Sequence, residues 1–270
     1  MKFVEKLLNI SRKNNSLLCV GLDTDIEKIP KFLLNDDDPI FFFNKKIIDA
    51  TSDLVCAYKP NAAFYEASGI KGWEALKKTC EYIPNEIPII IDAKRGDIGN
   101  TARMYAKAIF EDLKADATTV SPYLGEDSIS PFLAYEDKCA IILCLTSNKG
   151  AEDFQLQKID DKPLYELVAE KILKWNVKGN CGLVVGATYP EQLKRIRDIV
   201  GKLPILIPGI GAQKGDLEKT VKFGTDDEGN LAIINSSRGI IFSSEKEDFA
   251  ERAREKAKKL RDEINLFRKK

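Results

Sequence analysis

Short runs of apolar residues recur along the whole chain, and each run gives way to polar residues and then to a helix-like segment. The runs are rich in Ile, Val and Leu, a composition typical of strands buried in a parallel sheet. They predict strands over eight ranges: 17–22, 54–58, 89–94, 117–120, 140–145, 182–185, 204–207 and 231–234. Strands that alternate with helices form parallel βαβ units, and eight such units in about 250 residues are typical of a (β/α)8 barrel, the TIM barrel of the α/β class.

The segments between the strands carry helical patterning. Helices are expected from the N-terminus to Lys13, over 39–53, 100–110, 126–135, 190–200 and 245–266, and in segments that end near residues 83, 175 and 223. Residues 149–162 are expected to form a polar loop, and 225–230 a polar turn. No linker or shift in composition divides the chain, so we expect a single domain over residues 1–270.

An open, doubly wound sheet is the structural alternative to the barrel. Such a sheet more often carries one Gly-rich dinucleotide-binding loop after its first strand. Here the first strand ends in Gly21-Leu-Asp-Thr-Asp25, which lacks that pattern. The barrel is therefore the favoured fold.

The charges of the chain are balanced, with 42 Lys and Arg residues against 42 Asp and Glu residues. This balance gives no indication of nucleic acid or an anionic membrane as a partner. No apolar run approaches the ~18 residues of a membrane-spanning helix. The charged, amphipathic N-terminal segment lacks the apolar core of a signal peptide. We therefore expect a cytoplasmic protein that binds neither nucleic acid nor membranes.

The chain has no histidine, which excludes Ser-His-Asp triads, Cys-His nucleophiles and metal sites with histidine ligands. Proton transfer must then use Lys, carboxylate, Tyr, Cys or water. The cysteines form no CxxC pair and most lie in apolar runs, so we expect small buried residues rather than a disulfide framework or a zinc site. They are Cys19, Cys56, Cys80, Cys139, Cys144 and Cys181.

One stretch, residues 89–101, changes abruptly from apolar to charged. Three isoleucines precede Asp92, Lys94 and Asp97, and glycines in the same stretch suggest a tight turn. If the strand continues to Lys94, then Asp92 and Lys94 point to the same side, because side chains alternate along a strand. A surface ion pair at a strand end is the plain alternative. Charges that directly follow a buried run, with similar breaks after other strands, favour a functional site.

In a barrel of this type the active site lies at the carboxyl ends of the strands. The sequence places polar side chains there: Asp23, Lys59, Asn61, Asp92, Lys94, Asp97, Ser147, Gln213 and Arg238. Loops 208–213 and 235–239 follow the seventh and eighth strands, where this fold commonly binds phosphate. Their glycines expose backbone N–H groups, and the Arg238 guanidinium suits bidentate phosphate contacts. These features favour a phosphorylated substrate.

Charges of both signs are mixed in this set, as in Lys59, Asp92, Lys94 and Asp97. Opposite charges can keep one another ionised in a partly buried site. In a chain without histidine, Lys94 is the natural proton donor, and a carboxylate beside it could repel a negatively charged substrate group. Asp23, Asp92 and Asp97 could instead bind Mg²⁺. The nearby lysines would compete with a cation, so no metal is expected.

These motifs resemble those of the orotidine 5'-phosphate decarboxylase family. Asp92-Ala-Lys-Arg-Gly-Asp97 matches its Asp-x-Lys-x-x-Asp signature, which metal-dependent relatives such as hexulose phosphate synthases share. The ordered set is more specific and covers essentially the whole chain: Asp23, Lys59-Pro-Asn61, Thr146-Ser-Asn148, Pro208-Gly-Ile-Gly-Ala-Gln213 and Ser237-Arg-Gly239. The metal-dependent relatives usually carry a metal-binding acid at the position of Lys59.

The resemblance implies decarboxylation of orotidine 5'-phosphate to uridine 5'-phosphate (UMP) and CO2, without metal or organic cofactor, as the last step of de novo pyrimidine nucleotide biosynthesis. It implies that Lys94 donates a proton to C6 of the pyrimidine and that Asp92 crowds the departing carboxylate. Lys59 would anchor the ribose side of the charged network, and Asp23 would hold a ribose hydroxyl.

The resemblance also implies further substrate contacts and a partner. The contacts are, in chain order, Asn61 for the ribose, Ser147 for the pyrimidine, and Gly211, Gln213, Arg238 and Gly239 for the phosphate. The partner is a second copy of the chain: Asp97 and Thr101 would reach across a homodimer interface into the other site.

Two other functions stay open. A metal-dependent barrel lyase that acts on a sugar phosphate would lose its activity with a chelator. A catalytically silent barrel would bind a nucleotide tightly without turnover. The intact Asp92, Lys94 and Asp97 favour an enzyme over the silent barrel.

Overall fold

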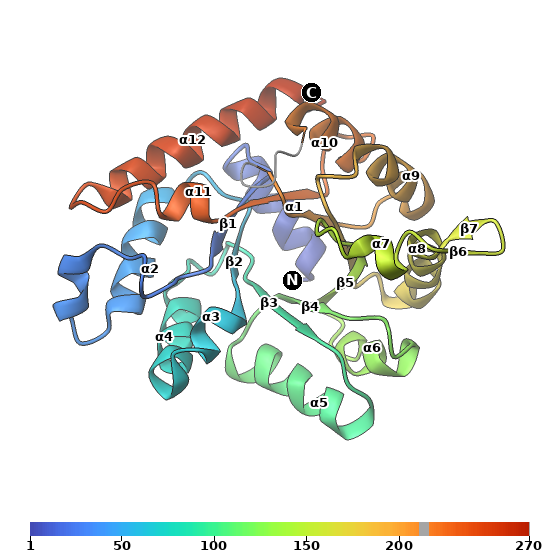
Figure 1. Cartoon of the computed structure of the whole chain (residues 1–270), viewed down its shortest axis with the longest axis horizontal. Coiled ribbons are helices and arrows are strands. Elements are labelled where there is room, and N and C mark those ends of the chain that lie inside the picture. Colours follow the sequence, from blue (N-terminus) through green and yellow to red (C-terminus); the bar gives the residue numbers. More distant parts are fainter. Residues whose placement is uncertain (211–215, 270) are drawn as a thin grey trace.

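The computed structural model describes residues 1–210 and 216–269, and its eight parallel strands stand in a ring with helices around it (Figure 1). The strands of the ring are β1 (Leu18–Leu22), β2 (Ala57–Pro60), β3 (Ile90–Arg95), β4 (Ala117–Val120), β5 (Cys139–Leu145), β8 (Cys181–Val185), β9 (Ile205–Ile207) and β10 (Ala232–Ser236). Their order in the sheet is β2-β1-β10-β9-β8-β5-β4-β3. The predicted (β/α)8 barrel is confirmed.

The ring closes between β2 and β3, the two strands at the ends of that order. Within the described residues, two isolated bridges join these strands, one between Tyr58 and Ile89 and one between Asn61 and Asp92. The Tyr58 amide also donates a hydrogen bond to the Pro88 carbonyl at 3.0 Å. We call this contact the seam. The barrel is nearly closed, so the open, doubly wound alternative is wrong.

Most helices surround the ring in Figure 1, whereas α1 lies behind its middle. The helices of the described chain are α1 (Phe3–Lys13), α2 (Pro39–Thr51), α3 (Ala62–Glu66), α4 (Gly69–Tyr82), α5 (Gly99–Lys107), α6 (Glu126–Leu133), α7 (Ala151–Phe154), α8 (Leu164–Trp175), α9 (Pro190–Val200), α10 (Leu217–Gly224), α11 (Arg238–Ile241) and α12 (Phe249–Phe267). α5 continues directly into a π-helical turn over 108–112. The predicted alternation of strands and helices is therefore present along the chain.

The core lies in and around the strands, because both faces of a parallel barrel sheet are covered. Every residue of β1, β4 and β10 is buried. All six cysteines are buried as well, as the sequence predicts. Burial raises the pKa of Cys56, Cys80 and Cys181 to about 12, so these thiols stay neutral packing groups.

Some element boundaries differ from the predicted ones. The loop predicted over 149–162 contains α7 and the first part of a short antiparallel hairpin, β6 (Lys158–Ile159) with β7 (Lys162–Pro163). β2 begins at Ala57 and continues to Pro60, because its ladder pairs Gly21 with Lys59 and Leu22 with Pro60. β10 continues to Ser236, which pairs with Val20 of β1. For β2 and β10 the neighbouring strand, rather than local hydrophobicity, sets the boundary.

The amino ends of the strands are covered by α1 and the segment after it. Lys6 forms an ion pair of 2.7 Å with Asp116, just before β4, and the same carboxylate accepts the Ile89 amide at 2.9 Å. The Ser16 hydroxyl donates to the Leu54 carbonyl at 2.7 Å, ahead of β2. These contacts close one end of the barrel and leave the carboxyl ends of the strands for the site.

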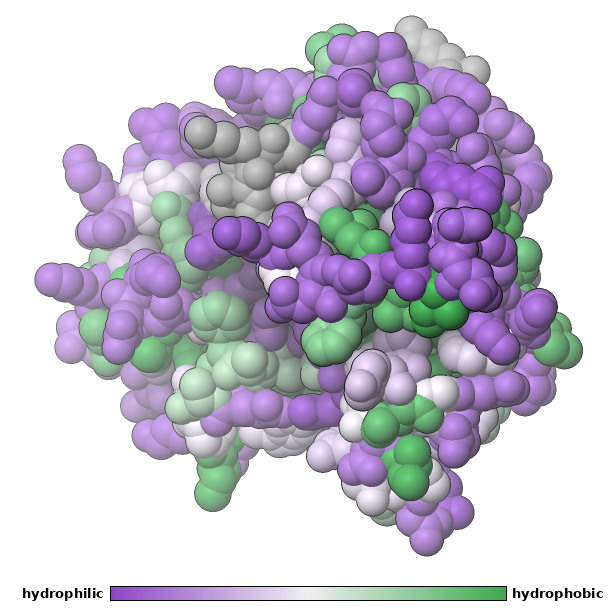
Figure 2. Space-filling view, turned by 45° about the vertical axis from the view of Figure 1, so that its right-hand side comes forward, coloured by the Kyte–Doolittle hydropathy of each residue, from purple (hydrophilic) through white to green (hydrophobic). Residues whose placement is uncertain are grey.

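Hydrophilic residues cover most of the face shown in Figure 2, and hydrophobic residues interrupt them in small separate groups. None of the helices in the described part of the chain is long and apolar enough to cross a lipid bilayer.

A buried arginine ties the amino ends of two strands to the helical layer. Arg197 of α9 is 8% exposed, and each of its hydrogen-bond partners in the described chain is a backbone carbonyl. Its guanidinium donates to Leu203 at 2.7 Å and Leu231 at 3.2 Å, which precede β9 and β10. It also donates to Gly201 and Gly224. Burial lowers the pKa of Arg197 to about 10, so the group is still charged at neutral pH.

Arg197→Met should therefore destabilise the fold, because it removes contacts at the amino ends of the strands, opposite the site. The substitution leaves several buried carbonyls without a donor, and hydrogen bonds from charged groups contribute about 1.5–3 kcal/mol each. We expect the free energy of unfolding, measured by chemical denaturation, to fall by about 3 kcal/mol. Lys194→Met on the same helix is the control, because Lys194 pairs with Asp198 at the surface and its loss should cost less than about 1 kcal/mol. Equal losses in both variants would contradict this role of Arg197.

Candidate active site

A cavity of about 670 Å³ opens at the carboxyl ends of the strands. Each strand of the ring, or the loop that follows it, contributes to the wall. In ring sequence from β1 to β10, the wall includes Asp23, Lys59, Asp92, Thr119, Leu143, Val184, Leu206 and Asn235. One side is charged and the other apolar, so the cavity suits a ligand with both characters.

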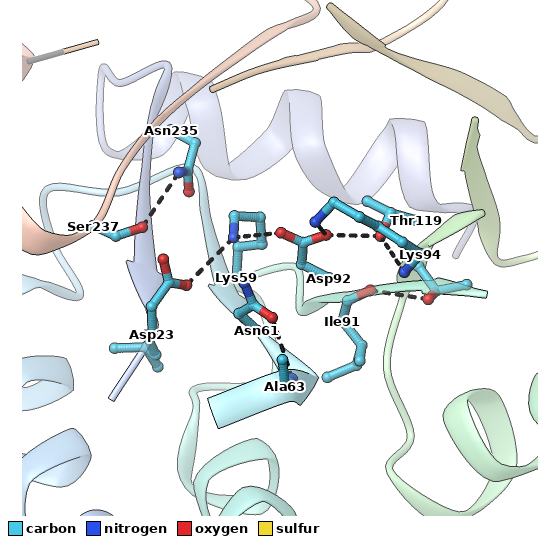
Figure 3. Close-up of polar contacts among 12 residues, drawn as sticks. Asp23, Lys59, Asn61, Ala63, Ile91, Asp92, Lys94, Thr119, Asn235 and Ser237 are labelled. Atoms are coloured by element: carbon cyan, nitrogen blue, oxygen red, sulfur yellow. Dashed lines mark hydrogen bonds and ion pairs between the residues drawn. The ribbon is translucent and has the colours of Figure 1, made fainter. Parts of the chain in front are cut away.

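Lys59 is the most deeply buried charge of the cavity, at 3% exposed. Its ammonium lies 3.0 Å from Asp92 Oδ2 and 3.5 Å from Asp23 Oδ1 (Figure 3). The three residues come from the ends of three adjacent strands, β1, β2 and β3. A buried ammonium needs such partners, because an isolated charge is costly to remove from water.

Asp92 is held at both carboxylate oxygens. Oδ2 accepts from Lys59, and Oδ1 accepts from Lys94 Nζ at 2.6 Å and from Thr119 Oγ1 at 2.8 Å. The prediction that Asp92 and Lys94 lie on the same side is confirmed. The Lys94 side chain is 50% exposed, so its ammonium reaches the open part of the cavity.

These contacts fix the ionisation of the buried pair. Burial alone would raise the pKa of Asp92, but the charges of Lys59 and Lys94 and the hydrogen bonds from Lys94 and Thr119 outweigh it and hold that pKa well below its usual range. Burial alone would lower the pKa of Lys59, but Asp92 and Asp23 outweigh it and raise that pKa above its usual value. The contribution of Asp92 to stability is therefore complete above about pH 4, and that of Lys59 is complete below about pH 10.

Within the described residues, the rest of the predicted site divides into two groups. Ser147, Arg238 and Gly239 line the same cavity. Asn61, Asp97 and Thr101 do not border it: Asn61 Oδ1 accepts the Ala63 amide at 3.2 Å and so caps α3.

Asp97 and Thr101 lie beyond the end of β3 instead. Asp97 Oδ1 accepts the amide of Ile98 at 2.8 Å within its own loop. Thr101 is exposed on α5. Gly211 and Gln213 lie outside the described residues, so their part in the site stays a prediction.

The apolar wall consists of Leu143, Val184, Leu206 and Ile210. Its shape depends on Gly186, directly after β8, because a Cβ atom there would lie 2.8 Å from the backbone of Ser147. Only a glycine allows the loops after β5 and β8 to approach so closely. This contact places Ser147 at the cavity.

The sequence analysis did not identify two residues of the cavity wall, Thr119 and Asn235, as site residues. Thr119 is 1% exposed and bonds both to Asp92 and to the Lys94 amide. Asn235 is 7% exposed, and its Oδ1 is buried without a hydrogen-bond partner in the described chain. The available signal was the presence of polar residues inside strands that are otherwise apolar.

Residues 16–253 match the model of the family described as orotidine 5'-phosphate decarboxylase / HUMPS. A curated relative from Dehalococcoides mccartyi, named orotidine 5'-phosphate decarboxylase, is 53% identical over 273 residues, which cover 100% of this chain and 99% of its own. A relative of the same name from Ralstonia pickettii is 49% identical and covers 99% of this chain and 100% of its own. The solved structure of Leishmania donovani OMP decarboxylase has a TM-score of 0.86 at 41% identity, covering 99% of this chain and 98% of its own.

Lys59→Met should show how far the fold depends on the buried ammonium. The variant removes the positive charge shared by Asp23 and Asp92, and breaking a buried ion pair from one side costs about 3–5 kcal/mol. We expect the free energy of unfolding at pH 7 to fall by about 3 kcal/mol. Lys77→Met is the matched control, because Lys77 pairs with Asp112 at the surface and should cost less than about 1 kcal/mol. If Lys59→Met were no less stable than its control, the cluster would not support the fold.

Proposed function

The chain belongs to the orotidine 5'-phosphate decarboxylase / HUMPS family, and we propose that it is a carboxy-lyase that converts orotidine 5'-phosphate to UMP and CO2. This reaction ends de novo pyrimidine nucleotide synthesis. The observation that carries the proposal is the row of alternating charges, Asp23, Lys59, Asp92 and Lys94, in a cavity that also holds Arg238. A volume of about 670 Å³ suits a mononucleotide.

The chemical step needs positive charge where electrons gather. Breaking the bond between C6 and the carboxylate releases CO2 and leaves the electron pair on C6. The Lys94 ammonium stabilises that pair and gives C6 a proton, and water then returns a proton to Lys94. Asp92 is kept ionised by its partners, so it repels the substrate carboxylate beside it and favours its departure as neutral CO2.

The ribose lies toward Asp23 and Lys59 in this proposal. Asp23 Oδ1 is buried and has no hydrogen-bond partner in the described chain, and its nearest charge is Lys59 at 3.5 Å. An unpaired buried acceptor of this kind suits a ribose hydroxyl, which would satisfy it. Asn61 caps α3 and does not border the cavity, so in this proposal it supports the ribose indirectly, from the neighbouring strand end.

Ser147 contacts the pyrimidine, and the phosphate binds at the ends of the last two strands of the ring. Arg238 and Gly239 border the cavity there and would be joined by Gln213 and the Gly211 amide. Phosphate binding far from C6 can drive closure of the site and so lower the barrier of the chemical step.

We propose that the active form is a homodimer in which Asp97 and Thr101 complete the partner's site. Both residues lie next to exposed apolar side chains, since Ile98 is 52% and Met104 is 51% exposed. Apolar exposure at this level on one short segment suits a subunit contact. Because Asp97 does not border the cavity of its own chain, a second copy gives it a role.

We propose that the reaction uses no metal and no organic cofactor. Lys59 occupies the space between the two carboxylates, Asp23 and Asp92, that would otherwise be available to a cation. In the described part of the chain, no group of three or more His, Cys, Asp or Glu side chains is arranged to hold a metal ion. The proposed chemistry relies on the lysine charges instead.

The proposal is tested by following the ultraviolet absorbance of orotidine 5'-phosphate with the purified protein, with and without EDTA. We expect equal conversion to UMP in both. Activity that disappears with EDTA would indicate a metal-dependent lyase, to be assayed next on sugar phosphates. Tight nucleotide binding without any conversion would indicate a catalytically silent barrel.

Lys94→Ala should lose turnover while the protein stays folded. Removal of a general acid costs about 100- to 10,000-fold in rate, so we expect kcat to fall at least about 100-fold with UMP binding retained. Lys171→Ala, at an exposed position on α8, is the control and should keep wild-type kcat. Turnover near the wild-type rate in Lys94→Ala would remove Lys94 as the acid.

The homodimer is tested by mixing two inactive variants, Asp97→Ala and Lys94→Ala. A hybrid dimer contains one intact site, formed by Lys94 of one chain and Asp97 of the other. Random reassembly in an isologous dimer should therefore restore about a quarter of wild-type activity. Native mass spectrometry confirms that hybrids form, and hybrids without recovered activity would refute a shared site.

A further inference from the structure

Three residues of β3 face a single residue of β4. The ladder pairs Ile91 with Thr118 and then, after an irregularity, Arg95 with Val120. Asp92, Ala93 and Lys94 therefore all lie opposite Thr119. A bulge of this kind leaves backbone groups without their usual ladder partners and redirects side chains.

Thr119 supplies the missing partner with its side chain. Its Oγ1 accepts the Lys94 amide at 2.9 Å and donates its proton to Asp92 Oδ1 at 2.8 Å (Figure 3). The same Asp92 oxygen accepts Lys94 Nζ at 2.6 Å. One hydroxyl thus joins the backbone of the lysine to the carboxylate that its ammonium contacts.

The bulge places Lys94 in an unusual conformation. Its φ is +47°, in the left-handed region that residues with a side chain rarely adopt. Such a conformation persists only where the surroundings hold it. The bond from the Lys94 amide to Thr119 is the contact that holds it on the β4 side.

The single proton of the Thr119 hydroxyl is used by its bond to Asp92, and the residue is 1% exposed. It therefore has no proton left for a substrate. Its β-branched side chain has few χ1 rotamers, so the hydroxyl keeps a fixed direction. The geometry suits a residue that orients others rather than one that reacts.

We propose that Thr119 is the positioning residue that sets Asp92 and Lys94 for the chemical step. The inference rests on the proposed function, because it assigns Thr119 a part in the same reaction. Loss of the hydroxyl removes the only side-chain link in the described chain between the Lys94 amide and Asp92 Oδ1 and leaves that oxygen with Lys94 Nζ alone. Small displacements of reacting groups reduce rates strongly.

The test compares Thr119→Val, Thr119→Ser and Thr118→Val. Val keeps the shape of Thr without the hydroxyl, and Ser keeps the hydroxyl. Thr118 is the matched control on the same strand: it is also buried, but its hydroxyl donates to the Ile91 carbonyl at 2.9 Å and its side chain points to the other face of the sheet.

Thr119→Val should lower kcat at least about tenfold while KM and the affinity for UMP change less than about threefold, because the phosphate and ribose contacts are untouched. Thr119→Ser should retain at least about half of the wild-type kcat, and Thr118→Val should lower only the denaturation midpoint. If Thr119→Val does not fold, Thr119→Ala takes its place.

Wild-type kcat in Thr119→Val, or a Ser variant as defective as the Val variant, would overturn the inference. A wild-type protein that does not convert orotidine 5'-phosphate would refute the proposed function instead. In that case crystal structures of the wild type and of Thr119→Val still test whether Thr119 positions Asp92 and Lys94. We expect Lys94 Nζ to leave Asp92 in the variant, and an unchanged bulge with both contacts intact would overturn it.

Discussion

The site depends on one ammonium group that is removed from water. Lys59 can be charged at 3% exposure only because Asp92 and Asp23 lie beside it, and Asp92 stays ionised only because lysines surround it. The partners come from three different strand ends, so the cluster exists only in the assembled barrel. The fold thus holds the charges in place, and the charges in turn select the arrangement of β1, β2 and β3.

The fold could be predicted because parallel barrel strands produce a recognisable sequence pattern, in which apolar runs are each followed by polar residues and a helix. The exact boundaries could not. Residues 54–56 are as apolar as a strand, yet β2 begins at Ala57, and the polar Ser236 belongs to β10 because Val20 lies opposite it. The register depends on both strands of a pair, so it cannot be predicted from the sequence of one strand alone.

The site was predictable to a similar degree. The alternation of side chains along a strand predicted that Asp92 and Lys94 lie on one side, and the two side chains do form a contact. The contact depends on a bulge in β3, which the alternation of side chains does not predict. Thr119 was missed because threonine is ordinary in strands and its partners belong to another strand. Asn61 and Asp97 stand in the expected sequence positions yet outside the cavity of the chain. Residue type and order indicate the chemistry, whereas the backbone decides which groups meet.

The seam between β2 and β3 affects how the barrel is held closed. Elsewhere in the ring, ladders of two or more residue pairs join the strands, in two cases with an irregularity, whereas two isolated bridges join β2 and β3 in the described chain. The Lys59–Asp92 ion pair crosses the same seam. Electrostatic attraction between side chains therefore supplements the main-chain contacts that close the ring. A charged ligand bound beside Lys59 and Asp92 would therefore change the contacts that close the barrel as well as the charges of the cavity.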